Sequence, residues 1–299
     1  MTAEGAVGAA AVPVDPPRVA VRDAVTRALA EDLLPLGDLS GALVAADVTA
    51  TVAVVARQVG VVAGGLCAVE TFAQVDPAVA VEWAVPDGGD VWPGTVVGSV
   101  HGSLRSILAA ERTALNFLGH LSGVATMARA YVMAVAAANP ATRILDTRKT
   151  TPGLRALEKA AVRAGGAHNH RGSLSEAVMI KDNHRGGTGV AVAVGRARAL
   201  WPGRAVEVEC DRFDQVTEAL SAGATAVLLD NMSPDDVASC VKIVRAHAGG
   251  EGVVIEVSGG VTLDSAPLYA AAGADVISVG ALTHSAPVLD LGLDLMEGP

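Results

Sequence analysis

The stretch from Val206 to Asp230, VEVECDRFDQVTEALSAGATAVLLD, contains two short apolar runs that end in acidic residues and enclose one helical segment. Valine-rich and leucine-rich runs with a helical segment between them are typical of parallel β-strands joined by a helix. The same pattern recurs in the C-terminal half, at intervals of 21 to 35 residues. The polar ends of the runs lie near Asp146, Lys181, Glu209, Asp230, Ser258 and Gly280.

This spacing predicts a parallel β/α barrel, in which the chemistry lies on the loops at the C-terminal ends of the strands. Six strands are evident from the pattern. A seventh could lie between Gly123 and Gly166, and a complete set of eight is not evident.

The N-terminal third has a different pattern. A helix is predicted over 17–34, and short valine-rich strands over 51–56, 61–63, 79–83 and 95–101 indicate a compact antiparallel module. The segment 104–137 has a helical pattern, which Gly119 and Gly123 are expected to divide into two helices. We therefore expect a disordered tail (1–16), an N-terminal domain (17–125), a barrel domain (126–286) and a C-terminal segment (287–299) that packs back on the N-terminal domain.

The composition excludes several classes of protein. The 299 residues include three widely spaced cysteines and no CxxC pattern, which gives no support to a disulfide framework or a structural zinc site. Aromatic residues make up 3% and the net charge is -10, which disfavours a nucleic-acid binder. No uninterrupted apolar run reaches the roughly 18 residues that a membrane span needs. We expect a cytoplasmic protein without a membrane segment.

The positive charges of this acidic chain are concentrated in one segment. Between Arg143 and Arg185 nine Lys/Arg residues stand against four Asp/Glu, so the segment carries +5 and the remainder -15. Such a concentration of cations in an acidic protein indicates a site for a small, multiply charged anion.

The predicted strand ends carry side chains of three kinds. Arg148, His170, Arg171 and Lys181 offer donors to carboxylates. Glu209 and Asp230 suit sugar hydroxyls or a hard divalent cation such as magnesium. The last two turns, Ser258-Gly259-Gly260 and Gly280-Ala281-Leu282, offer backbone amides of the kind that bind a phosphate monoester. The pocket is therefore expected to hold carboxylates at one end and a phosphate at the other.

Several polar residues of the chain also have a simpler, structural interpretation. Glu209 and Asp230 could cap the helices that follow them. Arg112 could be a surface partner of Glu111, and His120 a core histidine. Arg155, Lys159 and Arg163 are spaced as a solvated face of one helix.

Nine motifs in order give the chain a resemblance to a known family. They are ED at 31–32 with GD at 37–38, ERTALNFLGHLSGVAT from Glu111, DTRKTTPGLR from Asp146, GGAHNHR from Gly165, MIKDNH from Met179, EVEC from Glu207, LLDNMSP from Leu228, VSGGV from Val257 and SVGALTHS from Ser278. The chain resembles the quinolinate phosphoribosyltransferases over about residues 17–295.

The resemblance implies a partly open, seven-stranded β/α barrel beside an N-terminal α/β sandwich domain. It implies transfer of ribose 5-phosphate from phosphoribosyl pyrophosphate to quinolinate, with magnesium. The products would be nicotinate mononucleotide, pyrophosphate and carbon dioxide, in the synthesis of NAD. It also implies a homodimer with a shared active site, and assembly of dimers into a hexamer is left open.

The resemblance also implies roles for individual residues. Thr147, Arg148, His170, Arg171 and Lys181 would bind quinolinate, and Arg112 would reach the site across the dimer interface. Lys149, Lys181, Glu209 and Asp230 would be catalytic, the two acids with magnesium held directly or through water. The turns 258–260 and 280–282 would bind the 5-phosphate.

Two other functions compete with this interpretation. One is a related phosphoribosyltransferase for nicotinate or another pyridine-like acid, and the other is a non-catalytic protein that binds a phosphorylated metabolite. Arg148 and Arg171 with Lys181 favour a dicarboxylate, and the presence of Lys149, Glu209 and Asp230 favours an enzyme.

Overall fold

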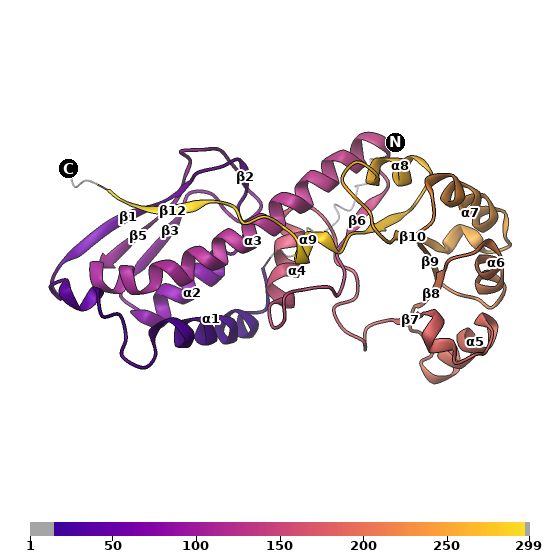
Figure 1. The fold of residues 1–299 in the computed structure, drawn as a ribbon, viewed down its shortest axis with the longest axis horizontal. Coiled ribbons are helices and arrows are strands. Elements are labelled where there is room, and N and C mark those ends of the chain that lie inside the picture. Colours follow the sequence, from indigo (N-terminus) through magenta and orange to yellow (C-terminus); the bar gives the residue numbers. More distant parts are fainter. Residues whose placement is uncertain (1–14, 297–299) are drawn as a thin grey trace, which may run out of the picture.

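The computed structural model describes residues 15–296, so most of the predicted N-terminal tail and the last three residues lie outside the described part. Figure 1 shows two β-structures side by side, joined by the long helix α3. An antiparallel sheet lies at one end of the molecule. A parallel sheet lies at the other, with helices along its outer side.

The N-terminal sheet is antiparallel, with the strand order β12-β1-β5-β3. Its valine-rich strands place Val52, Val54 and Val100 in a buried core together with Phe72 from α2. A two-stranded ribbon, β2 and β4, lies beside it. The elements of this part are α1 (Arg18–Leu33), η1 (Gly41–Leu43), β1 (Thr49–Ala56), β2 (Gly60–Val61), α2 (Gly65–Val75), β3 (Ala80–Trp83), β4 (Asp90–Val91) and β5 (Val96–Ser103).

The last strand comes from the other end of the sequence. β12 (Leu291–Leu295) pairs antiparallel with β1, with Val54 opposite Leu293. The C-terminal segment therefore returns to the N-terminal sheet, as the yellow ribbon in Figure 1 shows.

The C-terminal sheet is parallel, with the order β6-β11-β10-β9-β8-β7. Its strands are β6 (Arg143–Leu145), β7 (Val178–Ile180), β8 (Val206–Cys210), β9 (Ala226–Asp230), β10 (Val254–Ser258) and β11 (Val276–Ser278). A further parallel bridge joins Leu145 to His168, on the free edge of β6. The described residues thus form six strands and one single-residue bridge in place of a seventh strand, and the α/β barrel is partly open as expected.

Helices connect the parallel strands. They are α4 (Arg155–Ala164), η2 (Asp182–Arg185), α5 (Val190–Leu200), α6 (Phe213–Ser221), α7 (Pro234–Ala246), η3 (Gly250–Gly252), α8 (Ala266–Ala271) and α9 (Ala281–His284). In Figure 1, α5 to α8 follow the outer side of the sheet, while α4 and α9 lie toward the N-terminal module.

The predicted division of the segment 104–137 is wrong, because α3 (Leu104–Ala138) is one continuous helix. Gly119 and Gly123 serve close packing instead. A Cβ at Gly123 would collide with the backbone oxygen of Pro287, and Leu289 donates its N–H to the carbonyl of Gly119 at 3.0 Å. The C-terminal segment therefore crosses directly over the backbone of α3 on its way to β12.

Helix α3 is long and apolar enough to span a membrane by length and composition alone. In the structure it packs against α2, α4 and α8, and residues such as Leu118, Leu121 and Val124 are buried inside the protein. A core helix satisfies the same length and composition criteria, and α3 is a core helix here.

Candidate active site

The polar residues predicted at the strand ends gather along one edge of the parallel sheet. Strands β7 to β11 and β6 point in one direction, so their C-terminal ends meet there. Lys181 follows β7, and Glu209 is the penultimate residue of β8. Asp230 and Ser258 end β9 and β10, where they pair in register. This arrangement is typical of the active-site end of a β/α barrel.

Lys181 and Glu209 form an ion pair across neighbouring strands. The Lys181 side chain is 40% exposed, which leaves its ammonium accessible to a ligand as well as to Glu209. The helix-cap alternative fails for both acids, because Arg212 occupies the N-cap of α6 and Ser233 the N-cap of α7.

The two glycine turns lie close to side chains of the same edge. Gly259 has φ +93°, and a Cβ there would collide with the amide of Asn231, which follows Asp230. A Cβ on Gly280 would lie 3.1 Å from Cδ of Lys149. Thr283 also donates its hydroxyl to the Lys149 carbonyl at 2.7 Å. The first turn therefore needs glycine at 259, and the second lies beside the predicted Lys149.

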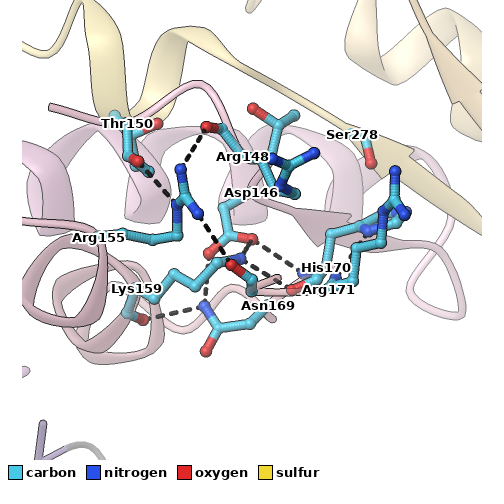
Figure 2. A network of polar contacts seen from close by, with 12 residues as sticks. Asp146, Arg148, Thr150, Arg155, Lys159, Asn169, His170, Arg171 and Ser278 are labelled. Carbon is cyan, nitrogen blue, oxygen red and sulfur yellow. Dashed lines mark hydrogen bonds and ion pairs between the residues drawn. The ribbon is translucent and has the colours of Figure 1, made fainter. Parts of the chain in front are cut away.

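Asp146, at the end of β6, is fully buried and accepts three hydrogen bonds (Figure 2). Its donors are the Lys159 ammonium, the Asn169 amide at 2.6 Å and the His170 backbone N–H at 2.8 Å. Burial raises the pKa of Asp146, and the charge of Lys159 opposes that shift. The carboxylate thus ties the turn at 169–170 to helix α4.

The prediction that Arg155, Lys159 and Arg163 form a solvated face of α4 is wrong. Lys159 is 7% exposed, and Arg155 and Arg163 are half-buried and donate to Gly172 and Asn169. The periodicity fixes which residues share a face, but that face packs against charged and polar groups at the C-terminal edge of the sheet instead of water.

Arg148 points into this region with one unsatisfied donor. Its Nε is buried and has no hydrogen-bond partner in the described residues. A buried donor without a partner is costly unless a ligand or water supplies an acceptor. The same loop is fixed by Thr147, whose hydroxyl accepts the Lys149 backbone N–H at 3.0 Å.

Arg171 lies near Arg148. Burial lowers the pKa of Arg171, and the charge of Arg148 lowers it further, so the two guanidinium groups lie within electrostatic reach of each other. Arg171 donates to the Ala177 carbonyl at 3.0 Å and to Sδ of Met179 at 3.5 Å. It also lines a cavity of about 850 Å³ between β7 and α5. Two neighbouring guanidinium groups can hold two carboxylates.

The ring of His170 enters the interior of the barrel. Its Nε2 lies 3.2 Å from Glu256 and 3.4 Å from Glu207, and Ser278 donates to Glu256 at 2.5 Å. These three ionisable residues are the one group in the described part whose atoms are close enough to hold a metal ion together. Ion pairing satisfies all three without a metal.

The charges around His170 act in opposite directions. Desolvation lowers the pKa of His170, but hydrogen bonds and charge from Glu207 and Glu256 raise it to about 10. The Arg171 backbone N–H, 2.7 Å from Nδ1, favours the neutral ring. Burial raises the pKa of Glu207 to about 7, while its partners lower that of Glu256. At least one carboxylate therefore stays charged at neutral pH, and because Nδ1 accepts the Arg171 N–H, the ring faces the two carboxylates with Nε2.

Arg112 lies elsewhere. It is exposed on α3 and lines a cavity of about 210 Å³ with residues of α1 and with His120. It forms no ion pair with Glu111 in residues 15–296. His120 is bonded to the buried Glu158 at 2.8 Å, which agrees with the structural interpretation of that histidine. Within one chain, Arg112 is not part of the group formed by Arg148, His170 and Arg171.

Sequence reasoning missed the supporting residues Asp146, Glu207, Glu256 and Ser278. A signal was present for Glu207 and Glu256, because each interrupts a run of valines in a strand that is buried on both faces. A charged residue inside such a strand needs a buried partner.

Comparison with known proteins gives a consistent result. Residues 25–122 match the model of the quinolinate phosphoribosyl transferase N-terminal domain, and residues 124–294 match that of the C-terminal domain. A Mycobacterium leprae protein named nicotinate-nucleotide pyrophosphorylase [carboxylating] is 41% identical over 92% of this chain and 97% of its own.

Two further proteins agree with this match. A Synechocystis protein, named a probable nicotinate-nucleotide pyrophosphorylase [carboxylating], is 42% identical over 81% of this chain and 82% of its own. The solved nicotinate-nucleotide pyrophosphorylase from Francisella tularensis superposes with a TM-score of 0.88 at 37% identity, over 95% of this chain and 99% of that chain.

Proposed function

The chain belongs to the quinolinate phosphoribosyltransferase family, and we propose that it transfers ribose 5-phosphate from phosphoribosyl pyrophosphate to quinolinate with loss of carbon dioxide. The products are nicotinate mononucleotide and pyrophosphate, and the reaction belongs to the de novo synthesis of NAD. The enzyme is a pentosyltransferase. The observation that carries the assignment within the site is the buried Nε of Arg148, which has no acceptor in the described residues, in a group that also contains His170 and Arg171 (Figure 2).

Quinolinate binds through its two adjacent carboxylates. Arg148 has a buried Nε without an acceptor, and a substrate carboxylate supplies one. Arg171, His170 and Lys181 complete the cationic group, and Thr147 fixes the loop that carries Arg148. Nicotinate has one carboxylate and would leave part of this charge unpaired, which disfavours it as a substrate.

The residues at the ends of β8 and β9 fit a magnesium ion. Glu209 and Asp230 offer hard carboxylate oxygens on neighbouring strands, and neither side chain is fully buried. Oxygen ligands of this kind suit Mg²⁺, held directly or through water. When bound, the ion offsets the charge that develops on the departing pyrophosphate.

The protein side chains stabilise charge on both sides of the breaking bond. Positive charge grows at the ribose anomeric carbon as pyrophosphate leaves, and Glu209 and Asp230 favour it. Lys149 and Lys181 offset the negative charge on the leaving group. The quinolinate ring nitrogen is itself the nucleophile, so the protein supplies position rather than a base; good positioning can contribute roughly 7–11 kcal/mol.

The 5-phosphate is bound at the glycine turns. Ser258, Gly259 and Gly260 follow β10, and Gly280, Ala281 and Leu282 follow the neighbouring strand β11. Backbone amides at such turns, late in a β/α barrel, suit a phosphate monoester. The substrate then extends from this turn to the Arg148 loop, with ribose beside Asp230.

Decarboxylation follows ribosyl transfer. The bond from the ring to the carboxylate at the carbon adjacent to the nitrogen breaks, and its electron pair stays on that carbon, stabilised by the positive pyridinium nitrogen. Carbon dioxide leaves, and the ring carbon takes up a proton from water. The cationic side chains have to release that carboxylate as it becomes neutral carbon dioxide.

We place the enzyme in the cytoplasm as a homodimer at least, and as a hexamer if dimers associate further. Arg112 is exposed and remote from the cations of its own chain, which is the position required of a residue that completes a partner's site. Each dimer would then hold two shared active sites.

The direct test is turnover by the purified protein supplied with quinolinate, phosphoribosyl pyrophosphate and Mg²⁺. We expect nicotinate mononucleotide, pyrophosphate and carbon dioxide in equal amounts, with nicotinate a much poorer acceptor. Preferred use of nicotinate would support the related phosphoribosyltransferase instead. Binding of the phosphorylated substrate without any turnover would support the non-catalytic alternative.

A further inference from the structure

Helix α4 presents three basic side chains, Arg155, Lys159 and Arg163, at intervals of four residues on one face. None of the three is placed in the substrate-binding group above. In Figure 2, Arg155 and Lys159 lie between the loop that carries Arg148 and the turn that carries His170. Their contacts show what this row of cations holds.

Lys159, together with its partner Asp146, fixes both backbone polar groups of His170. Its ammonium bonds to Asp146 and donates to the His170 carbonyl at 2.8 Å. Asp146 in turn accepts the His170 backbone N–H at 2.8 Å. The N–H and the carbonyl of His170 are therefore both fixed by a single buried ion pair.

Arg155 joins the two substrate-binding segments to each other. It donates to the carbonyl of Arg148 at 3.3 Å and to the carbonyl of Gly172 at 3.1 Å. A third bond goes to the hydroxyl of Thr150 at 3.0 Å. The Arg155 guanidinium therefore links the backbone of Arg148, the first arginine predicted to bind quinolinate, to that of Gly172. Gly172 directly follows the second such arginine, Arg171.

Arg163 extends the row to Asn169. It donates to the Asn169 side-chain oxygen at 2.5 Å, and the Asn169 amide donates to Asp146 and to the Lys159 carbonyl. The contacts of α4 thus converge on residues 148–150 and 169–172.

We propose that Arg155 and Lys159 are positioning residues that set the spacing between Arg148 and the His170–Arg171 pair, and thereby the affinity for a ligand with two adjacent carboxylates. The inference rests on the proposed function, because that function supplies the dicarboxylate. Two carboxylates at a fixed separation are bound well only by cations at a matching separation.

A purely structural role would predict a different pattern. A buried ion pair is often no more stabilising than apolar residues of the same volume. If the row served stability alone, its loss would lower the melting temperature without affecting one substrate more than the other. If it sets the spacing, its loss would raise the KM for quinolinate more than the KM for phosphoribosyl pyrophosphate.

The test compares Arg155→Gln, Lys159→Met and Lys159→Arg with a matched control, Arg245→Gln. Arg245 on α7 also binds two backbone carbonyls and one further polar side chain, but at the opposite end of the sheet. For each variant we would measure the melting temperature, both KM values, kcat, and quinolinate binding by calorimetry without the second substrate.

We expect Arg155→Gln and Lys159→Met to weaken quinolinate binding by about tenfold or more, because misplaced guanidinium groups make poorer charge-assisted hydrogen bonds to the carboxylates. The KM for phosphoribosyl pyrophosphate should change much less. Lys159→Arg should recover part of the loss, and Arg245→Gln should leave both KM values unchanged. If Lys159→Met does not fold, the less buried Arg155→Gln carries the test.

Two results would overturn the proposal. One is a folded Arg155→Gln protein with wild-type affinity for quinolinate; the other is an equal rise in both KM values. A wild-type protein that neither binds nor turns over quinolinate would instead remove the proposed function, and the inference with it. Wild-type turnover with unaffected variants removes the inference alone.

Discussion

The two ends of the parallel sheet carry similar charged residues but pair them differently. At the N-terminal end, Arg245 donates to both carboxylate oxygens of Asp275 at 2.7 Å, and Asp275 also accepts the Ile255 N–H. At the C-terminal end, Arg148 keeps a buried donor without a partner, and Arg171 lies within reach of its charge.

At one end the charged side chains pair with each other, whereas at the other end we propose that Arg148 is left to pair with a ligand. At the N-terminal end Arg245 and Asp275 satisfy each other's charge. At the C-terminal end Lys159 and Lys181 are paired with Asp146 and Glu209, but the buried Nε of Arg148 is unfavourable in the free protein, because it has lost water without gaining an acceptor. We propose that a dianionic substrate supplies the missing acceptor.

The largest effect should come from removing a cation at the C-terminal end. Arg171→Ala should lower kcat/KM for quinolinate by more than about tenfold, because one substrate carboxylate loses a charge-assisted partner. Steady-state kinetics with both substrates measures this. Near-wild-type constants in the variant would show that Arg171 does not bind quinolinate.

The second prediction extends the comparison across the proposed dimer. Arg112→Ala and Lys181→Ala should each be nearly inactive alone. After subunit exchange, half of the dimers are mixed and each contains one intact site, so activity should recover to about a quarter of the wild-type value. Exchange can be verified by mass spectrometry of the intact dimers. Full exchange without recovery would show that Arg112 does not act in a partner's site.

The third prediction concerns pH. The pKa of His170 is raised from 6.5 to about 10, so the folded protein favours the charged ring. The stabilisation of the folded state by the charged ring is complete below about pH 6.5 and is lost as the pH rises through about 10. The groups facing the ring are Glu207 from β8, Glu256 from β10 and the Arg171 backbone.

Glu256→Gln removes one of the two charges that hold the ring positive. The free energy of unfolding should then fall less steeply between pH 6.5 and pH 10 than in the wild type. Denaturant unfolding across this range, with NMR titration of His170, makes the measurement. Identical pH profiles in the two proteins would contradict the raised pKa of His170.

The smallest effect should come from the N-terminal end. Arg245 and Asp275 are about one-third exposed, at 34% and 38%, so their pairing is partly screened by water. Arg245→Gln should lower the free energy of unfolding by about 1 kcal/mol or less. Neither kcat nor either KM should change, and a kinetic defect would break the distinction between the two ends.

The sequence was sufficient to predict the barrel and the edge on which its polar residues gather. Each apolar run ends in a polar residue, and parallel strands bring such ends together. Asp230 and Ser258 illustrate this, since they lie 28 residues apart in sequence and pair in register.

The supporting residues could not be predicted in the same way. The spacing of Lys159 shows which face of α4 it occupies, but not whether that face meets water or a buried acid. Its partner Asp146 lies thirteen residues earlier, on a different element. Gly123 likewise indicates a weak point in an isolated helix, whereas its role depends on Pro287, far along the chain.

The most direct test of the account is the structure of the protein with quinolinate bound. We predict that the two carboxylates contact the guanidinium groups of Arg148 and Arg171, with the Nε of Arg148 acquiring an acceptor. Quinolinate bound with its carboxylates away from these groups, and Arg148 Nε still without a partner, would contradict the claim that these cations are reserved for a dicarboxylate.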